Sequence, residues 1–208
     1  MSAILELTDV VKHFPVRRFL LKPKKHVHAV DDVSLSVQSG DTFGLVGESG
    51  CGKTTLGKCI AGLHRITSGS IRFDGEEVAQ LNEQQFRPYR RRISMVFQDP
   101  GNSLNPRLRV RSLLAEPLHF QRIKLTSGEL VNRIDKALSD VGLDSSYRNR
   151  YPHEFSGGQQ QRIGIARALM LQPDFIVCDE PVSALDVSVQ AQILNLLNWL
   201  QQEYALTY

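Results

Sequence analysis

The residues Gly47-Glu48-Ser49-Gly50-Cys51-Gly52-Lys53-Thr54-Thr55 decide the fold of this 208-residue chain. They match G-x-x-x-x-G-K-[ST], the pattern of a phosphate-binding loop that joins a strand to a helix. The apolar residues 42–46 predict a buried strand before the loop, and residues 55–63 predict a helix that ends at a glycine. Small loop residues let backbone N–H groups turn toward phosphate oxygens, and the helix start adds its positive dipole end. The chain is therefore predicted to bind a nucleoside triphosphate.

Within the loop, Lys53 is expected to reach the β- and γ-phosphates, and the Thr54 hydroxyl is expected to ligate Mg²⁺. A glycine-rich turn without a ligand is the alternative interpretation, and the flanking strand and helix disfavour it. The loop residues predicted to hold the nucleotide are Gly47, Ser49, Gly50, Cys51, Gly52, Lys53, Thr54 and Thr55.

The composition is ordinary for a soluble globular domain. A net charge of +3 is too small to indicate nucleic-acid binding. The N-terminus lacks the basic and apolar regions of a secretory signal, and no run reaches the ~18 apolar residues of a membrane span. We therefore expect an intracellular protein that meets a membrane only through partners.

The three cysteines offer neither an even disulfide framework nor a zinc-binding spacing. Cys59 and Cys178 are expected to be small buried side chains. Cys51 lies in the phosphate-binding loop at a helix N-terminus, where a thiolate is favoured. Alkylation of Cys51 is therefore predicted to block nucleotide binding.

The N-terminal part is predicted to be rich in strands. Residues 4–11 and 30–37 alternate between apolar and polar side chains, and residues 71–75 and 92–97 predict two further strands. The basic residues 17–26 could contact anionic lipid headgroups, but a solvated hairpin loop is the favoured interpretation.

The second half is predicted to alternate helices with one strand. Residues 107–140 have helical spacing and Gly142 closes the second helix of this stretch, while residues 158–171 and 188–203 predict two more helices. The wholly apolar residues 175–178 predict a central parallel strand. Strands that alternate with helices around a phosphate-binding loop predict an α/β fold.

Two carboxylates, Asp179 and Glu180, follow this last strand, at the edge where open α/β sheets bind ligands. Asp179 can hold Mg²⁺ through water, and Glu180 can orient and deprotonate an attacking water. Alone, such a pair fits a solvated loop start equally well. The phosphate-binding loop favours the functional interpretation.

A second glycine motif, Ser156-Gly157-Gly158-Gln159, opens a predicted helix. Its backbone N–H groups can form an anion site, although an ordinary helix cap with Ser156 is the alternative. The motif lies between the phosphate-binding loop and the two carboxylates in the sequence.

The order and spacing of these motifs resemble those of the ATP-binding cassette (ABC) ATPases. The phosphate-binding loop resembles Walker A, and Asp179-Glu180 resembles the end of Walker B. Ser156–Gln159 resembles the LSGGQ signature, with Phe155 where leucine is commonest. Gln98 resembles the Q-loop glutamine, and Ser183-Ala184-Leu185-Asp186 resembles the D-loop.

The aromatic residue Phe14 resembles the residue that stacks on adenine, with His13 as a second candidate. The resemblance covers essentially the whole chain. It implies a single domain over residues 1–208, built on a P-loop NTPase core with an N-terminal antiparallel β subdomain. It also implies a helical subdomain of about residues 100–165 between the Q-loop and the signature.

The resemblance also implies roles for residues. Glu180 and Gln98 would be catalytic, and Thr54, Gln98 and Asp179 would hold Mg²⁺ beside ATP. Two such subunits would enclose two ATP molecules, and closure of this dimer would drive two transmembrane permease subunits. Ser156 and Gly157 would act on ATP bound by the second subunit, and Gly158, Gln159 and Asp186 are further candidates for nucleotide binding.

A closer resemblance connects three segments to the oligopeptide/dipeptide importer ATPases: Gly47–Lys53, residues 98–107 and Glu180–Ser188. Nickel importers share this style of sequence, so peptide and nickel both remain open. The implied partners are a second ATPase subunit, identical or different, two permeases and, indirectly, a substrate-binding protein, with no nucleic acid. The implied location is the cytoplasmic face of the inner membrane, as a peripheral protein.

Two other classes of function compete with the importer ATPase. One is a soluble cassette ATPase that acts on DNA or ribosomes, which usually has a coiled-coil insertion or two cassettes. The other is a non-catalytic nucleotide-binding subunit.

The family's switch histidine follows Walker B, whereas no histidine follows His153 in this sequence, which stops at Tyr208. We expect a truncated copy rather than a degenerate subunit, and slow ATP hydrolysis by these 208 residues alone.

Overall fold

The computed structural model describes residues 3–16 and 25–208, and the chain divides into two compact units. The first unit contains residues 1–90 and Thr207, and the second contains residues 91–206 and Tyr208. Most of the predicted hairpin loop, residues 17–24, lies outside the described residues.

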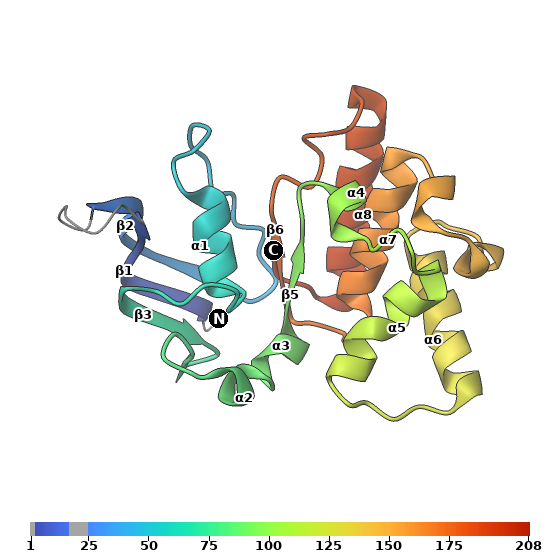
Figure 1. Cartoon of the computed structure of the whole chain (residues 1–208), viewed down its shortest axis with the longest axis horizontal. Coiled ribbons are helices and arrows are strands. Elements are labelled where there is room, and N and C mark those ends of the chain that lie inside the picture. The colour runs from blue at the N-terminus through green and yellow to red at the C-terminus, as the bar shows by residue number, and fades with distance from the viewer. Residues whose placement is uncertain (1–2, 17–24) are drawn as a thin grey trace. The chain divides into compact units, whose positions relative to one another are not determined.

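An antiparallel sheet forms the first unit, with the strand order β2-β1-β3-β4 (Figure 1). The strands are β1 (Ala3–Val16), β2 (Lys25–Gln38), β3 (Ser68–Phe73) and β4 (Glu76–Glu77). Apolar side chains from the first three strands are buried, among them Leu5, Leu7, Val10, Val37, Ile71 and Phe73. The predicted N-terminal strands are confirmed, and both extend beyond the alternating segments that indicated them.

The ladder between β1 and β2 shifts its register at four places, and the two shifts between Val10 and His13 matter here. Val10 pairs with Val33, Lys12 with Val30, and His13 with His28, so β2 carries one extra residue in each interval. Asp32, inside the first interval, has a positive φ of 53°. These are β-bulges, which change the direction in which neighbouring side chains point.

Helix α1 (Lys53–Ile60) follows the phosphate-binding loop, as predicted. Its buried residues include Leu56, Cys59 and Ile60. The chain leaves the helix through Gly62, whose φ of 67° lies in the left-handed region that favours glycine. A short helix, α2 (Glu83–Phe86), is capped by Asn82.

The buried strand predicted over residues 42–46 is wrong for this structure. The described residues 41–48 have no regular secondary structure, and Phe43, Leu45 and Val46 are 44%, 44% and 93% exposed. A strand requires a neighbouring backbone as a hydrogen-bond partner. The described strands of the first unit pair only with one another, so the apolar run alone misled the prediction.

The second unit combines a short parallel sheet with helices. Strand β5 (Ile93–Val96) pairs with β6 (Phe175–Cys178), in a register that runs from Ile93↔Phe175 to Val96↔Cys178. The helices of at least eight residues are α5 (Val110–Phe120), α6 (Ser127–Asp140), α7 (Gly157–Leu169) and α8 (Val187–Tyr204). The shorter ones are α3 (Tyr89–Arg92), which begins in the first unit, α4 (Pro100–Ser103) and the 3₁₀ helices Ser145–Asn149 and Pro152–Glu154.

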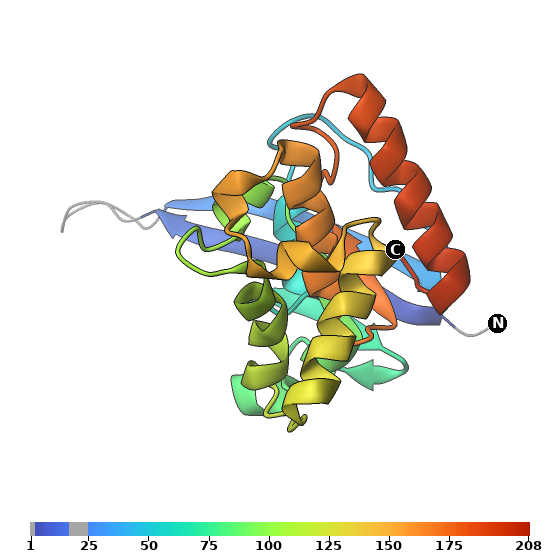
Figure 2. The same cartoon turned by 90° about the vertical axis from the view of Figure 1, so that its right-hand side faces the viewer.

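The predicted helices of the second unit are confirmed, and α5 and α6 lie side by side (Figure 2). Thr126 and Glu129 form a capping box at the start of α6, and these hydrogen bonds hold the pKa of the Glu129 carboxyl below its usual range. Gly142, with a φ of 70°, follows the end of α6 as predicted. Among the described residues, no helix combines the length and apolarity that a membrane span requires.

Candidate functional site

Two glycines of the phosphate-binding loop have backbones that other residues rarely adopt. Gly50 has a φ of 83° and Gly52 a φ of 103°. A Cβ atom on Gly52 would also lie 1.9 Å from the carbonyl oxygen of Ala29, so no side chain fits there. A Cβ atom on Gly47 would lie 2.7 Å from the Cys51 sulfur. The compact turn therefore depends on glycine at two levels, backbone conformation and close packing.

The Lys53 side chain folds back over this loop. Its ammonium donates hydrogen bonds to the carbonyl oxygens of Gly47 and Glu48, both at 2.8 Å. The next residues, Thr54 and Thr55, lie half-buried in the first turn of α1. A positive charge and the start of a helix thus meet at the same loop, which is the arrangement that binds phosphate.

The three cysteines differ in exposure, and burial was predicted correctly for Cys59 but only partly for Cys178. Cys59 is buried and Cys178 is half-buried, while Cys51 is exposed. Burial raises the pKa of Cys59 to about 11 and that of Cys178 to about 12. Both thiols therefore stay protonated near neutral pH. Cys51 is the exposed thiol among the three.

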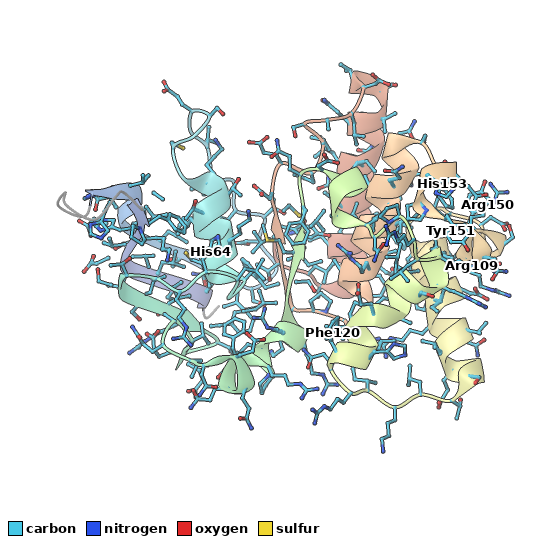
Figure 3. The ribbon with its side chains drawn as sticks, viewed as in Figure 1. His64, Arg109, Phe120, Arg150, Tyr151 and His153 are labelled. Carbon is cyan, nitrogen blue, oxygen red and sulfur yellow. The ribbon has the colours of Figure 1, made fainter. Side chains whose placement is uncertain are left out.

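Phe14, the predicted adenine-stacking residue, lies near the end of β1. The Lys12 ammonium is 4.6 Å from its ring centroid, and the His64 ring meets it edge-on at 5.4 Å (Figure 3 labels His64). Burial and the charges of Lys12 and Lys58 lower the pKa of His64, which disfavours the protonated imidazole. His13 has different neighbours, because its ring packs against His28 with centroids 3.8 Å apart.

In the second unit, Gln98 and Glu180 meet directly. The Gln98 amide donates hydrogen bonds to the Glu180 carboxylate at 2.8 Å and to the Ser183 hydroxyl at 3.3 Å. The Ser183 hydroxyl in turn donates to the Glu180 carbonyl oxygen at 3.1 Å. The structure therefore joins the predicted Q-loop, Walker B and D-loop residues in one network, and the sequence analysis missed the part that Ser183 plays.

The backbone at Glu180 is strained. Its φ of 45° is rare for a residue with a side chain, and such positions cost about 1–3 kcal/mol. The preceding Asp179 is fixed to the sheet, because its N–H donates to the Val96 carbonyl oxygen at 2.9 Å. Strain of this kind concentrates at functional sites, so it supports a special role for this carboxylate.

The predicted signature starts helix α7 with a side-chain cap. The Ser156 hydroxyl accepts a hydrogen bond from the Gln159 N–H at 3.4 Å, and the Gln159 side chain accepts one from the Ser156 N–H at 3.1 Å. The sequence left two interpretations of this motif open, an ordinary helix cap and an anion site. Both have a physical basis, because Ser156 caps the helix and the helix start is also exposed.

The signature also packs against the predicted D-loop and the residues that follow it. A Cβ atom on Gly158 would lie 2.5 Å from Val189, and one on Gly157 would lie 3.5 Å from Leu185. Asp186 forms the N-cap of α8, and its carbonyl oxygen accepts hydrogen bonds from Val189 and Gln190, both at 2.9 Å. The structure thus brings the signature and the D-loop together.

Contacts before the signature hold its loop in place. The Gln160 side chain donates to the carbonyl oxygens of Pro152 and Phe155 at 3.0 and 3.1 Å, a role that the sequence analysis missed. The Tyr151 ring stacks on His153, and the Arg109 guanidinium lies 5.4 Å from the Tyr151 centroid (Figure 3). The available signal for Gln160 was its place as the second glutamine after a glycine pair, in the first turns of a helix.

The fold and these motifs define a P-loop NTPase. The profile of the ABC transporter family matches residues 30–183. The chain therefore belongs to the ABC transporter family, as its motifs indicated.

Curated relatives extend beyond this chain. Oligopeptide transport ATP-binding protein AppF of Bacillus subtilis is 52% identical over 100% of the chain and 63% of its own length. Oligopeptide transport ATP-binding protein OppF of Escherichia coli is 47% identical over 99% of the chain and 63% of its own length. The chain thus spans about 63% of the length of these relatives.

Solved cassettes share the fold. A dimeric, post-hydrolysis structure of the ATP-binding cassette MJ0796 bound to ADP and phosphate matches with a TM-score of 0.85 and 31% identity, over 98% of this chain and 85% of that one. The structure of cbiO1 from Clostridium perfringens, part of the transporter complex cbiONQ, matches with a TM-score of 0.80 and 26% identity, over 100% and 77%. The predicted α/β, P-loop NTPase fold class is confirmed.

Proposed function

We propose that this chain binds and hydrolyses ATP to power an ABC importer of peptides. The observation that carries the proposal is the loop at Gly50, Gly52 and Lys53, whose backbone and charge suit phosphate binding. Relatives named oligopeptide transport ATP-binding proteins support peptides as the cargo. Nickel is the second candidate for the cargo.

In this proposal, the phosphate-binding loop holds the phosphates of ATP and Phe14 stacks on adenine. Thr54, Gln98 and Asp179 are proposed as ligands of Mg²⁺, because each side chain carries an oxygen atom, the kind of ligand that this ion prefers. Mg²⁺ neutralises phosphate charge during phosphoryl transfer. The Gln98 amide nitrogen donates to Glu180, so its amide oxygen is the atom suited to the ion.

Glu180 is proposed as the general base that orients and deprotonates the attacking water. The hydrogen bond from Gln98 at 2.8 Å holds this carboxylate, and the strained backbone fixes its direction. Both features favour a positioned base over a carboxylate that moves freely in solvent.

The signature residues and Asp186 are proposed to act on ATP held by a second subunit, which makes the working form a dimer. These residues are Ser156, Gly157, Gly158, Gln159 and Asp186. The capped but exposed start of α7 supports this role, since its motif is presented at the surface of its own unit.

Residues 100–165 are proposed as the helical subdomain that contacts the permeases. Between α5 and α6 lies a groove of about 760 Å³. Its apolar lining includes Leu108, Ala115, Phe120, Leu130, Val131 and Ile134, and Phe120 is 74% exposed (Figure 3). An apolar groove between two helices suits an amphipathic segment of a partner. The chain would then lie on the cytoplasmic face of the membrane, with the substrate-binding protein acting through the permeases.

Peptide uptake by cells tests this proposal. In cells that carry Glu180→Gln in the chromosomal gene, we expect uptake of a labelled oligopeptide to fall by about 10²–10⁴-fold, the usual effect of losing a general base. Glu203→Gln, an exposed carboxylate near the end of α8, is the matched control and should leave uptake unchanged.

Protein levels measured in both strains separate loss of activity from loss of the protein. Unchanged uptake of both peptide and nickel in the Glu180→Gln strain would contradict the catalytic role. Loss of nickel uptake with normal peptide uptake would transfer the proposal to the nickel importers.

A further inference from the structure

Two imidazoles and a carboxylate converge on one face of the β1–β2 ladder, in a cluster that the proposed function does not use. His13 on β1 lies opposite His28 on β2, and Asp31 follows on β2. The Asp31 carboxylate lies 3.9 Å from the His13 Nε2 atom and 3.9 Å from the His28 Nδ1 atom. One ligand atom from each residue lies within 4.8 Å of the other two.

The bulges of β2 explain why these groups meet. His28 and Asp31 are three positions apart, so in a regular strand they would point to opposite faces. The extra residues on β2, one in each interval of shifted register, break this alternation. The Thr67 hydroxyl also accepts a hydrogen bond from the His13 N–H at 2.9 Å, which fixes the β1 side of the cluster.

His13 brings an unusual atom to this cluster. Its Nε2 is buried and has no hydrogen-bond partner among the described residues, whereas the Asp31 and His28 side chains are 69% and 59% exposed. Buried polar atoms are almost always satisfied in folded proteins. A ligand that enters from the solvent side, past Asp31 and His28, would satisfy it.

We propose that His13, His28 and Asp31 bind a divalent transition-metal ion, with Zn²⁺ as its representative. Imidazole nitrogen and carboxylate oxygen are ligands for Zn²⁺ at about 2.0–2.2 Å, and water takes the fourth position in open sites. The 3.9 Å separations exceed those in such a site only slightly, so small side-chain rotations suffice. Mg²⁺ and Ca²⁺ prefer all-oxygen ligands and do not suit this set.

The metal site would stiffen the segment beside the phosphate-binding loop. His13 precedes Phe14, and His28 precedes Ala29, whose carbonyl oxygen excludes any side chain at Gly52. The ion would tie these two strand positions together. Its binding does not require ATP, so this inference stands or falls separately from the proposed function.

Calorimetric titration of the 208-residue chain with Zn²⁺ tests the site. We expect one ion per chain, and no binding of Mg²⁺ under the same conditions. His28→Ala and Asp31→Ala should each weaken Zn²⁺ at least tenfold, and both side chains are mostly exposed, so the fold should survive. Circular dichroism verifies this. Repeating the titration in a Cys51→Ser background removes the exposed thiol as a competing ligand.

His26→Ala is the matched control. His26 is two positions before His28 on β2, and its ring centroid lies 6.4 Å from that of His13, but it is outside the cluster. Its loss should leave the Zn²⁺ affinity unchanged, because His26 supplies no ligand atom to the cluster. The proposal is overturned if the unaltered chain binds no Zn²⁺ at micromolar free concentrations. It is also overturned if His28→Ala and Asp31→Ala bind as well as the unaltered chain, or if His26→Ala weakens binding as much as they do.

Discussion

The two glycine motifs of this chain both open a helix, yet they use glycine differently. In the phosphate-binding loop, Gly50 and Gly52 adopt φ values of 83° and 103°, and α1 begins without a side-chain cap from Gly52. In the signature, neither Gly157 nor Gly158 has a positive φ, and Ser156 caps α7. Uncapped N–H groups remain for a ligand, whereas capped ones are partly satisfied by the protein.

The two loops are therefore suited to different tasks. The first loop depends on backbone conformations that turn N–H groups inward, which suits direct phosphate binding. The second depends on close packing, because a Cβ atom on Gly158 would meet Val189 at 2.5 Å. Substitutions in the first loop should therefore affect ATP, and those in the second should affect packing and the partner subunit.

The largest expected effect belongs to Gly52→Ala. The new methyl group would meet the Ala29 carbonyl, and the positive φ would add strain of about 1–3 kcal/mol. We expect at least a hundredfold loss of ATP affinity, measured with a fluorescent ATP analogue, and a lower melting temperature. Gly44→Ala is the control, since a Cβ atom there meets nothing within 4 Å. Equal affinity in both variants would remove the proposed role of Gly52.

Alkylation of Cys51 should have the next largest effect. The reagent meets an exposed thiol inside the phosphate-binding loop, while Cys59 and Cys178, with pKa values of about 11 and 12, stay protonated and unreactive near pH 7. ATP affinity should fall at least tenfold after treatment. Cys51→Ser should keep the affinity it had before treatment, and an equal loss in this variant would place the effect elsewhere.

Gly158→Ala should lower stability without lowering ATP affinity. The contact with Val189 must open, which costs about 1–3 kcal/mol, as overpacking usually does. Denaturant unfolding measures this cost. Gly157→Ala, where the Cβ atom would meet Leu185 at an ordinary 3.5 Å, is the control. Partial rescue of Gly158→Ala by Val189→Ala would identify the contact, and a lower ATP affinity would contradict the comparison.

The smallest effect is expected for Ser156→Ala. Loss of the cap should cost about 0.5–2 kcal/mol of folding free energy. Thr126→Ala, which removes the equivalent cap of α6, is the matched variant, and both should destabilise the chain to a similar extent. If Ser156→Ala is as stable as the unaltered chain, the capped start of α7 contributes nothing to folding.

The sequence predicted the local features of this molecule well. Helical periodicity located α5, α6, α7 and α8, because each buries one face along its length. The prediction of a strand over residues 42–46 was wrong, because a local apolar run does not show whether a neighbouring strand is available as a hydrogen-bond partner.

Contacts between distant segments were the other part that the sequence could not supply. The approach of Val189 to Gly158 and the hydrogen bond from Gln98 to Glu180 depend on how the second unit packs. His13, His28 and Asp31 come together because of bulges in β2, and neither turn residues nor the alternation of apolar and polar residues predicts these bulges. The order of the motifs predicted the family, but the roles of these side chains required coordinates.

Measuring ATP binding by the chain and by two lysine variants tests most directly whether the phosphate-binding loop holds ATP. The loop carbonyls hold the Lys53 ammonium in the phosphate-binding loop, whereas Lys58 lies in the last turn of α1. We predict that the unaltered chain and Lys58→Ala bind ATP with the same affinity and that Lys53→Ala binds at least tenfold more weakly. No ATP binding by the unaltered chain, or equal binding by all three, would contradict it.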